Sequence, residues 1–125
     1  MVQNINDTLY IKFSKLELSR ILDNTISNAI KYSKNSTKIE ISLQATTNDN
    51  DIELSIKDEG KGIKDISKIF DRYYRGDKIS GGFGIGLNIV KNICDQNNVK
   101  IEVKSHNQKG SQFIYYFINE KCNSF

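Results

Sequence analysis

Residues 21–33 read ILDNTISNAIKYS, and this stretch decides how the whole chain is interpreted. Its apolar residues recur at helical spacing, which predicts an amphipathic helix. Asn24, Asn28 and Lys31 fall on one face of that helix, because residues three and four apart share a face. Two carboxamides and an ammonium could hold a metal ion and the phosphate oxygens around it, and no carboxylate able to deprotonate water lies beside them. The pattern favours nucleotide binding and phosphoryl transfer over hydrolysis, with a plain polar helix surface as the alternative.

The length and composition are those of an ordinary globular protein. Residues 1–125 are expected to form a single domain with a hydrophobic core, since 38% of them are hydrophobic and 26% are charged. The net charge of +3 comes from scattered rather than clustered lysines, so nucleic acid is not an expected partner. No apolar run reaches membrane length. We therefore expect the domain itself to be cytoplasmic and not membrane-inserted, although a parent protein could be anchored in the inner membrane.

Neither cysteine nor the single histidine indicates a metal centre. Cys94 and Cys122 lack the spacing of metal ligands. Cys94 falls on the apolar face of a predicted helix, which favours a buried structural thiol, and Cys122 lies in the C-terminal tail. His106 lies in a polar turn, where we expect it to be exposed rather than catalytic.

The periodicity of apolar residues divides the chain into alternating helices and strands. Ser14 and Glu17 have the spacing of a capping box at the start of the first helix. Helices are predicted at 14–33 and 84–96, the second stopped by Asn97 and Asn98, with a short helical turn near 66–70. Strands are predicted at 38–45, 52–56, 99–103 and 113–117, with a possible short strand at 10–13, and a turn at 106–110 makes 99–103 and 113–117 a hairpin. Helices interleaved with strand pairs predict an α/β (α+β) two-layer sandwich with one helix-covered sheet face.

The second of these strands ends in a charge that faces inward. Apolar residues alternate through 52–56, and Asp58 has the same parity. A buried carboxylate is costly unless something hydrogen-bonds it. Gly60 and Gly62 follow at once, which indicates a sharp turn or a close approach to a ligand. Asp58 is therefore either a turn-forming residue or the acceptor for a buried exocyclic amine such as N6 of adenine.

A glycine-rich turn, GGFGIGL at 81–87, opens the second predicted helix. Such a turn offers unpaired N–H groups and the positive end of the helix dipole to a phosphate. It lacks the Lys-Ser/Thr ending of a P-loop and does not have the spacing of the dinucleotide fingerprint. Taken alone, it fits a phosphate cradle and an ordinary helix start equally well.

In their order along the chain, these segments resemble the ATP-binding catalytic domain of bacterial sensor histidine kinases. That domain belongs to a superfamily that also contains gyrase-type, mismatch-repair and heat-shock-chaperone ATPases. NTISNAIKYS resembles its asparagine box, DEGKGI the first glycine box, IFDRYYRGDK the phenylalanine box and GGFGIGL the second glycine box. The resemblance covers about residues 10–117. It implies a Bergerat-type ATP-binding fold, with a mixed sheet and about three helices on one face.

The resemblance also implies ATP and Mg²⁺ as ligands and assigns roles to individual residues. Asn28 would ligate Mg²⁺, and Asp58 would accept the adenine amine. Lys31 would contact phosphate, and Arg75 would reach the terminal phosphate or the incoming acceptor, so these two are the catalytic candidates. The remaining nucleotide contacts would come from Asn24, Tyr32, Gly60, Gly62, Ile63, Ile69, Tyr74, Gly82, Gly84, Gly86, Leu87 and Ser111.

The residue at position 24 distinguishes two activities within this resemblance. Hydrolytic relatives place a glutamate four residues before the metal-binding asparagine, where it activates water. Here that position is Asn24. A neutral imidazole nitrogen is already a nucleophile and needs less activation. Asn24 therefore favours a protein-histidine kinase, which transfers the γ-phosphate of ATP to histidine, over an ATPase.

The resemblance places the acceptor histidine on a separate helical hairpin. We expect that histidine-bearing dimerisation domain, from the same parent chain, to be the direct partner, and a response regulator of two-component signal transduction to be an indirect one. This chain alone is not expected to autophosphorylate. The short loop at 75–82 and the bulk of Phe83 leave an alternative open, namely a degenerate nucleotide-binding or regulatory interaction module without phosphotransfer.

Overall fold

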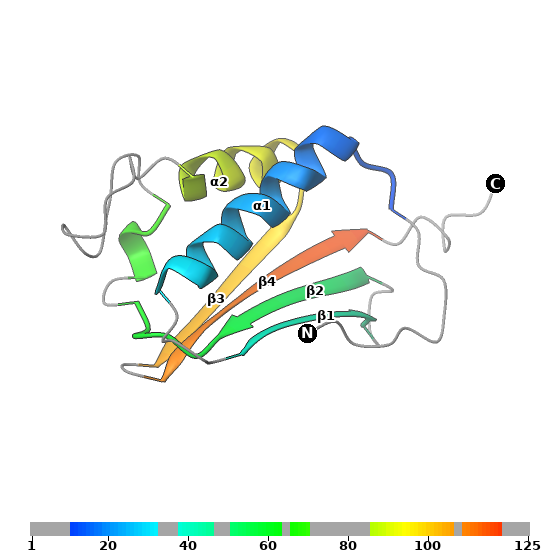
Figure 1. Ribbon diagram of the computed structural model, residues 1–125. Coiled ribbons are helices and arrows are strands. Elements are labelled where there is room, and N and C mark those ends of the chain that lie inside the picture. The colour runs from blue at the N-terminus through cyan, green and yellow to red at the C-terminus, as the bar shows by residue number, and fades with distance from the viewer. Residues whose placement is uncertain are drawn as a thin grey trace.

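Two helices lie across one face of a four-stranded sheet (Figure 1). The computed structural model describes residues 11–32, 38–46, 51–63, 66–70, 86–106 and 109–118. The helices are α1, Lys15–Tyr32, and α2, Gly86–Gln96, with a short 3-10 turn η1 at Ile66–Lys68. The strands are β1 (Ile39–Ala45), β2 (Asp51–Asp58), β3 (Lys100–His106) and β4 (Gly110–Ile118). The two-layer α/β prediction is confirmed.

The strand order is β1-β2-β4-β3, and every pairing within the described residues is antiparallel. The expectation of a mixed sheet is therefore wrong for this part of the chain. The physical reason is that β1 and β2 run antiparallel as sequence neighbours, as do β3 and β4, and the two pairs join through antiparallel β2 and β4. This junction places Asp58, at the end of β2, directly opposite Ser111 of β4.

Two further expectations need correction. The described residues contain two α-helices rather than about three, because the apolar pattern near 66–70 supports only the single turn η1. Residues 11–13 form no strand. Phe13 instead packs edge-on against Phe117 of β4, with the ring centroids 5.4 Å apart.

Both helices begin or end as their sequences indicate. Ser14 caps α1, since its Oγ accepts a hydrogen bond from the Glu17 N–H at 3.3 Å. Asn98 follows α2 with φ of 57°, the left-handed conformation that asparagine tolerates better than most residues. The start of α1 and the end of α2 are thus specified by local side-chain and backbone chemistry.

The core lies between the helices and the inner face of the sheet. Ile21 of α1, Val90 and Cys94 of α2 and Tyr115 of β4 have no exposed surface. The burial predicted for Cys94 is confirmed, and it raises the pKa of this thiol to about 12. Tyr115 is the largest of the fully buried side chains, and its hydroxyl lies 2.7 Å from the Thr25 hydroxyl of α1. This hydrogen bond connects α1 to β4, one of the two central strands.

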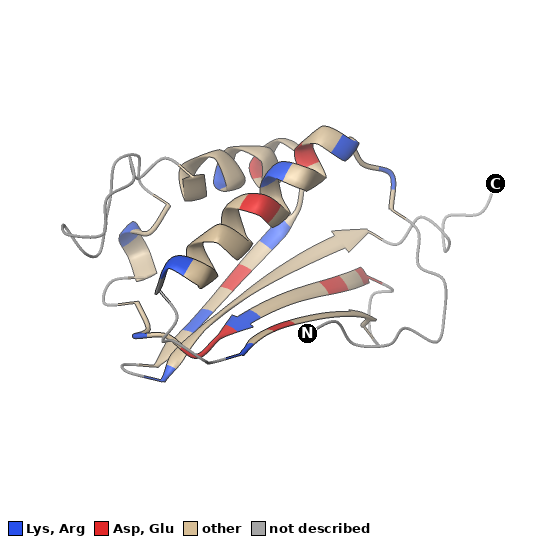
Figure 2. Cartoon of the chain, in the orientation of Figure 1, with Lys and Arg blue, Asp and Glu red and all other residues tan. Residues whose placement is uncertain are grey.

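The opposite face of the sheet is polar and carries its own hydrogen bonds. Gln44 of β1 donates to Glu53 of β2 at 2.7 Å, and the Tyr116 hydroxyl of β4 donates to Glu102 of β3 at 3.0 Å. Figure 2 shows charged residues along these strands. Among the described helices, none is long and apolar enough to cross a membrane.

Candidate functional site

The Asp58 carboxylate is the most buried charge in the described part of the chain, with 5% of the residue exposed. Its Oδ1 accepts a hydrogen bond from the Gly60 N–H at 2.9 Å, and the backbone of Ser111 also hydrogen-bonds it. Burial raises the pKa of Asp58, and these two hydrogen bonds oppose that rise. The inward orientation predicted from strand parity is confirmed. The turn-forming bond to Gly60 is also present, so Asp58 fits both interpretations.

The loop after β2 packs tightly against the end of the β3–β4 hairpin. Gly62 has φ of 82°, and a side chain there would collide with the His106 carbonyl. Gly110 has φ of 115°, and a side chain there would collide with the backbone of Asp58. Only glycine satisfies both the backbone angle and the space at these two positions. The Ile63 N–H then donates to the Ser105 Oγ at 2.6 Å.

The asparagine face of α1 meets the start of α2. The Asn24 Nδ2 donates to the Arg20 carbonyl at 2.7 Å. Its Oδ1 lies 2.8 Å from the position that a Cβ would occupy on Gly86, the first residue of α2. The structure therefore brings the asparagine box and the second glycine box into contact. Asn28 is half-buried one turn further along α1, and Lys31 follows, exposed, in the last turn.

The phenylalanine box is connected to the same helix. The Asn88 Nδ2 of α2 donates to the Phe70 carbonyl at 3.2 Å. Phe70 also packs edge-on against Phe113 of β4, with the ring centroids 6.3 Å apart. Ile69, predicted to pack near the nucleotide, is 6% exposed and belongs to the core, and Leu87 of α2 is half-buried beside that core.

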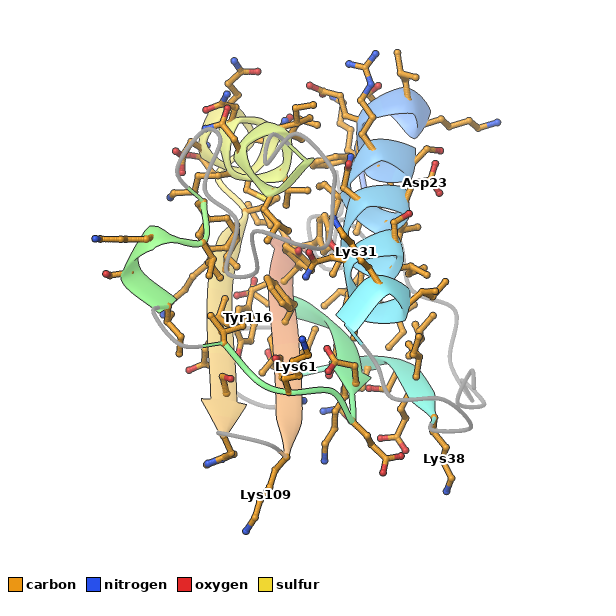
Figure 3. The ribbon with its side chains drawn as sticks, turned by 60° about the vertical axis from the view of Figure 1, so that its left-hand side comes forward. Asp23, Lys31, Lys38, Lys61, Lys109 and Tyr116 are labelled. Atoms are coloured by element: carbon orange, nitrogen blue, oxygen red, sulfur yellow. The ribbon has the colours of Figure 1, made fainter. Side chains whose placement is uncertain are left out.

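Exposed cations surround the end of the sheet that carries Asp58. Figure 3 shows Lys31 on the last turn of α1 above Lys61 of the loop after β2, with Lys38 and Lys109 projecting from the sheet end. Basic side chains at one end raise the local concentration of anionic ligands. His106 is exposed, as predicted, but it is the last residue of β3 rather than part of a turn.

Several predicted site residues cannot be placed. Tyr74, Arg75, Gly82 and Gly84 lie outside the described residues, and so does Phe83. Tyr32 ends α1, but its side chain is outside the described part. The roles assigned to these positions stay predictions.

Sequence reasoning missed three side chains that hold the site together. Thr25 anchors α1 to β4, Asn88 connects α2 to the phenylalanine box, and Ser105 anchors the first glycine box. Ser105 could have been found from parity. Ile101 and Val103 alternate toward the core on β3, so the next inward position is a polar residue at a strand end, the same signal that identified Asp58.

Known proteins identify the family of the chain and share its fold. The family described as histidine kinase-, DNA gyrase B-, and HSP90-like ATPase matches residues 14–121. The chain belongs to this family. The chain is 36% identical over 121 residues to the sensor histidine kinase WalK of Bacillus subtilis, and this match covers 91% of the chain and 20% of WalK. It is 35% identical to a sensor protein kinase WalK of Staphylococcus aureus, covering 92% of this chain and 28% of that protein. The chain thus spans between a fifth and just over a quarter of the length of these relatives.

Solved structures of histidine kinases share the fold. The mycobacterial sensor histidine kinase MprB superimposes with a TM-score of 0.77 at 23% identity, covering 87% of this chain and 76% of that one. The catalytic domain of histidine kinase ThkA superimposes with a TM-score of 0.76 at 23% identity, and the match covers 94% of this chain and 75% of the ThkA chain. The fold of this member of the ATPase family is therefore that of a histidine kinase catalytic domain.

Proposed function

We propose that this chain binds ATP and serves as the catalytic domain of a sensor histidine kinase. The observation that carries the proposal is the buried Asp58 carboxylate beside the glycine loop. A carboxylate has about four acceptor positions, and the backbone groups of Gly60 and Ser111 use two of them. The remaining capacity suits the N6 amine of adenine. Gly60, Gly62, Ile63, Ile69 and Ser111 would form the surroundings of the base.

The asparagine face of α1 suits Mg²⁺ and phosphate. No group of three His, Cys, Asp or Glu that could hold a metal ion occurs among the described residues. Mg²⁺ commonly binds proteins through one or two side-chain oxygens, with substrate phosphates and waters completing its octahedron. The Asn28 amide oxygen fits that requirement, and Mg²⁺ bound there would neutralise phosphate charge. Lys31, Asn24, Tyr32, Gly86 and Leu87, together with Gly82 and Gly84, would contact the phosphates.

Phosphoryl transfer, rather than hydrolysis, fits the chemistry at position 24. A carboxamide cannot serve as the general base that deprotonates water, and the Asn24 Nδ2 is already bonded to the Arg20 carbonyl. Transfer to a histidine depends mainly on positioning and on stabilising charge. Lys31 and Arg75 would supply that charge, and Tyr74 would pack nearby.

The length of the relatives supports a larger assembly. Because the chain matches only a fifth of the Bacillus WalK, we infer that it works with a histidine-bearing dimerisation domain of the same parent. A response regulator would receive the phosphoryl group from that domain. We place this catalytic domain in the cytoplasm, where ATP is available.

Base selectivity tests the nucleotide assignment. Calorimetry should show Mg²⁺-dependent ATP binding, with GTP much weaker because its O6 carbonyl faces the Asp58 carboxylate. Asp58→Ala should weaken ATP binding about ten- to a hundredfold, the loss expected for one hydrogen bond to a charged group. Asp23→Ala is the matched control, since Asp23 is exposed on α1 (Figure 3). Equal binding of GTP and ATP would contradict the role of Asp58.

Transfer is tested by adding a cognate dimerisation hairpin in trans with radiolabelled ATP. Label should appear on the histidine of the hairpin. Arg75→Ala should slow transfer at least tenfold, about 1.4 kcal/mol of barrier, while ATP affinity changes only a few-fold. Tight ATP binding without any transfer would instead identify a nucleotide-binding regulatory module.

A further inference from the structure

The β3–β4 hairpin supports the loop that follows β2 at three successive points. Gly110 packs on the backbone of Asp58, and Gly62 packs on the His106 carbonyl. The Ile63 N–H donates to the Ser105 Oγ at 2.6 Å. The Ser105 hydroxyl is then free to donate, and it does so to the Gly110 carbonyl at 3.4 Å. Ser105 thus connects the far end of the loop to the hairpin turn.

The two ends of this loop are fixed in different ways. At the near end, the Gly60 N–H is bonded to Asp58 itself. At the far end, Ile63 is held by Ser105, which lies more than forty positions later in the chain. The first anchor is local, whereas the second depends on the correct pairing of β3 with β4. Of the three contacts, the bond to the Ser105 hydroxyl on β3 is the hydrogen bond that fixes Ile63 from across the sheet, with β4 lying between β2 and β3.

We propose that Ser105 is a positioning residue for recognition of the adenine base, an inference that rests on the proposed nucleotide-binding function. By fixing the Ile63 peptide, Ser105 holds the Gly62 backbone and the Ile63 side chain in place in the loop that follows Asp58, where the base would bind. Without this bond the Ile63 N–H must find another partner, and the wall of the base site moves. Ser105 touches the loop rather than the nucleotide.

The test compares Ser105→Ala with two matched variants. Ser105→Thr keeps the hydroxyl and should restore binding. The Ser55 Oγ, on the opposite face of the same sheet, accepts a hydrogen bond of similar length, 2.7 Å, from the Gln112 Nε2. Ser55→Ala removes that bond. It measures the effect of losing a serine hydrogen bond away from the site. All three are compared with the wild type well below their unfolding temperatures.

Adenosine and inorganic tripolyphosphate test recognition of the base and of the phosphates separately. Ser105→Ala should weaken binding of ATP and of adenosine about three- to tenfold, the range expected from one lost neutral hydrogen bond. It should leave binding of inorganic tripolyphosphate unchanged and reduce the preference for ATP over GTP. Ser55→Ala should bind all of these ligands as the wild type does. Equal losses for adenosine and tripolyphosphate, or wild-type adenosine affinity in Ser105→Ala, would overturn the proposal.

A readout without nucleotide distinguishes this inference from the proposed function. In the free protein, amide exchange at Ile63 should accelerate in Ser105→Ala, while exchange at Gly60 stays unchanged because Asp58 still accepts its hydrogen bond. Unchanged Ile63 exchange would overturn the positioning role even if the protein binds ATP. A wild-type protein that binds no ATP would overturn the proposed function and this inference together, whatever the exchange at Ile63 shows.

Discussion

The buried carboxylate of Asp58 should make stability depend on pH in a defined direction. Burial raises the pKa of Asp58 above its ordinary value of 3.8. A proton then binds the folded state more tightly than the unfolded state. The resulting contribution to the free energy of unfolding is fully present below about pH 3.8. It is lost as the pH rises through the higher folded-state pKa.

Urea denaturation of the wild type and Asp58→Asn over a pH series measures this effect. The difference in free energy of unfolding, wild type minus variant, should fall as the pH rises from 3.8 toward the folded-state pKa. The slope should be at most about 1.4 kcal/mol per pH unit, and the difference should be flat above that range. A difference that grows with rising pH would mean that the hydrogen bonds from Gly60 and Ser111 outweigh burial.

The contact between Asn24 and Gly86 should appear as a coupling energy. In Gly86→Ala the new methyl would lie 2.8 Å from the Asn24 Oδ1, so the amide must rotate away from its bond to the Arg20 carbonyl. Overpacking costs typically ~1–3 kcal/mol. In an Asn24→Ala background that obstacle is gone, and alanine should then be tolerated better. A double-mutant cycle on thermal unfolding should give at least ~0.5 kcal/mol of coupling, and strict additivity would contradict the contact.

Single residues could be predicted where strand parity or helix spacing constrained them. Asp58 and Cys94 are buried as their patterns indicated, and His106 is exposed as expected, although it belongs to β3 rather than to the turn that follows. The parity of Ser105 was readable, but its partner Ile63 was not, and Asn88 likewise bonds a backbone group in another segment of the chain. A local pattern shows which face a side chain occupies, but not which distant loop will reach it.

At the scale of elements, the hydrogen bond between α1 and β4 should respond asymmetrically to mutation. The Thr25 Oγ1 donates to the Ile21 carbonyl at 2.6 Å, so the Tyr115 hydroxyl must be the donor in their shared bond. Tyr115→Phe removes that donor and leaves the Thr25 hydroxyl bonded. Thr25→Val leaves the Tyr115 hydroxyl buried without its acceptor. Urea denaturation should show ~0.5–1.5 kcal/mol lost for Tyr115→Phe and ~1–3 kcal/mol for Thr25→Val.

The serine variant provides the control for this pair. Thr25→Ser keeps the hydroxyl and loses only a methyl group. It should therefore retain most of the stability that Thr25→Val loses. Equal losses in Tyr115→Phe and Thr25→Val would contradict the donor assignment.

The elements themselves were largely predictable, because their apolar periods are long and their ends carry clear chemistry. The Ser14 cap and the left-handed Asn98 fall where the sequence indicates. Residues 11–13 have strand-like composition, yet Phe13 packs through its ring against Phe117 rather than through backbone pairing. The antiparallel pairing of β3 with β4 was predicted as a hairpin, whereas the directions of the pairings of β2 with β1 and with β4 were not predicted. Periodicity describes one strand at a time and gives no information on the direction of its neighbour.

For the molecule as a whole, Cys94 should report on global opening. The side chain has no exposed surface, and its pKa of about 12 keeps it as the unreactive thiol at neutral pH. In a Cys122→Ser variant, which leaves Cys94 as the single cysteine, labelling by a thiol reagent should require unfolding. The labelling rate should rise with urea in step with the loss of helical circular dichroism. Rapid labelling in native buffer would show a local opening of α2.

Nucleotide provides the control for this measurement. ATP at a hundred times its dissociation constant should slow the labelling about a hundredfold, because only the folded state binds it. GTP at the same concentration should have a much smaller effect.

The central pairing of β2 with β4 also has a kinetic consequence. These strands are far apart in the chain, yet their junction supplies both Asp58 and Ser111. Contacts between distant segments form late, because a long loop must close first. The base site would then be absent from the folding transition state. Adenosine should therefore leave the refolding rate unchanged and lengthen the lifetime of the native state, so that stopped-flow traces with and without ligand differ only in the unfolding limb.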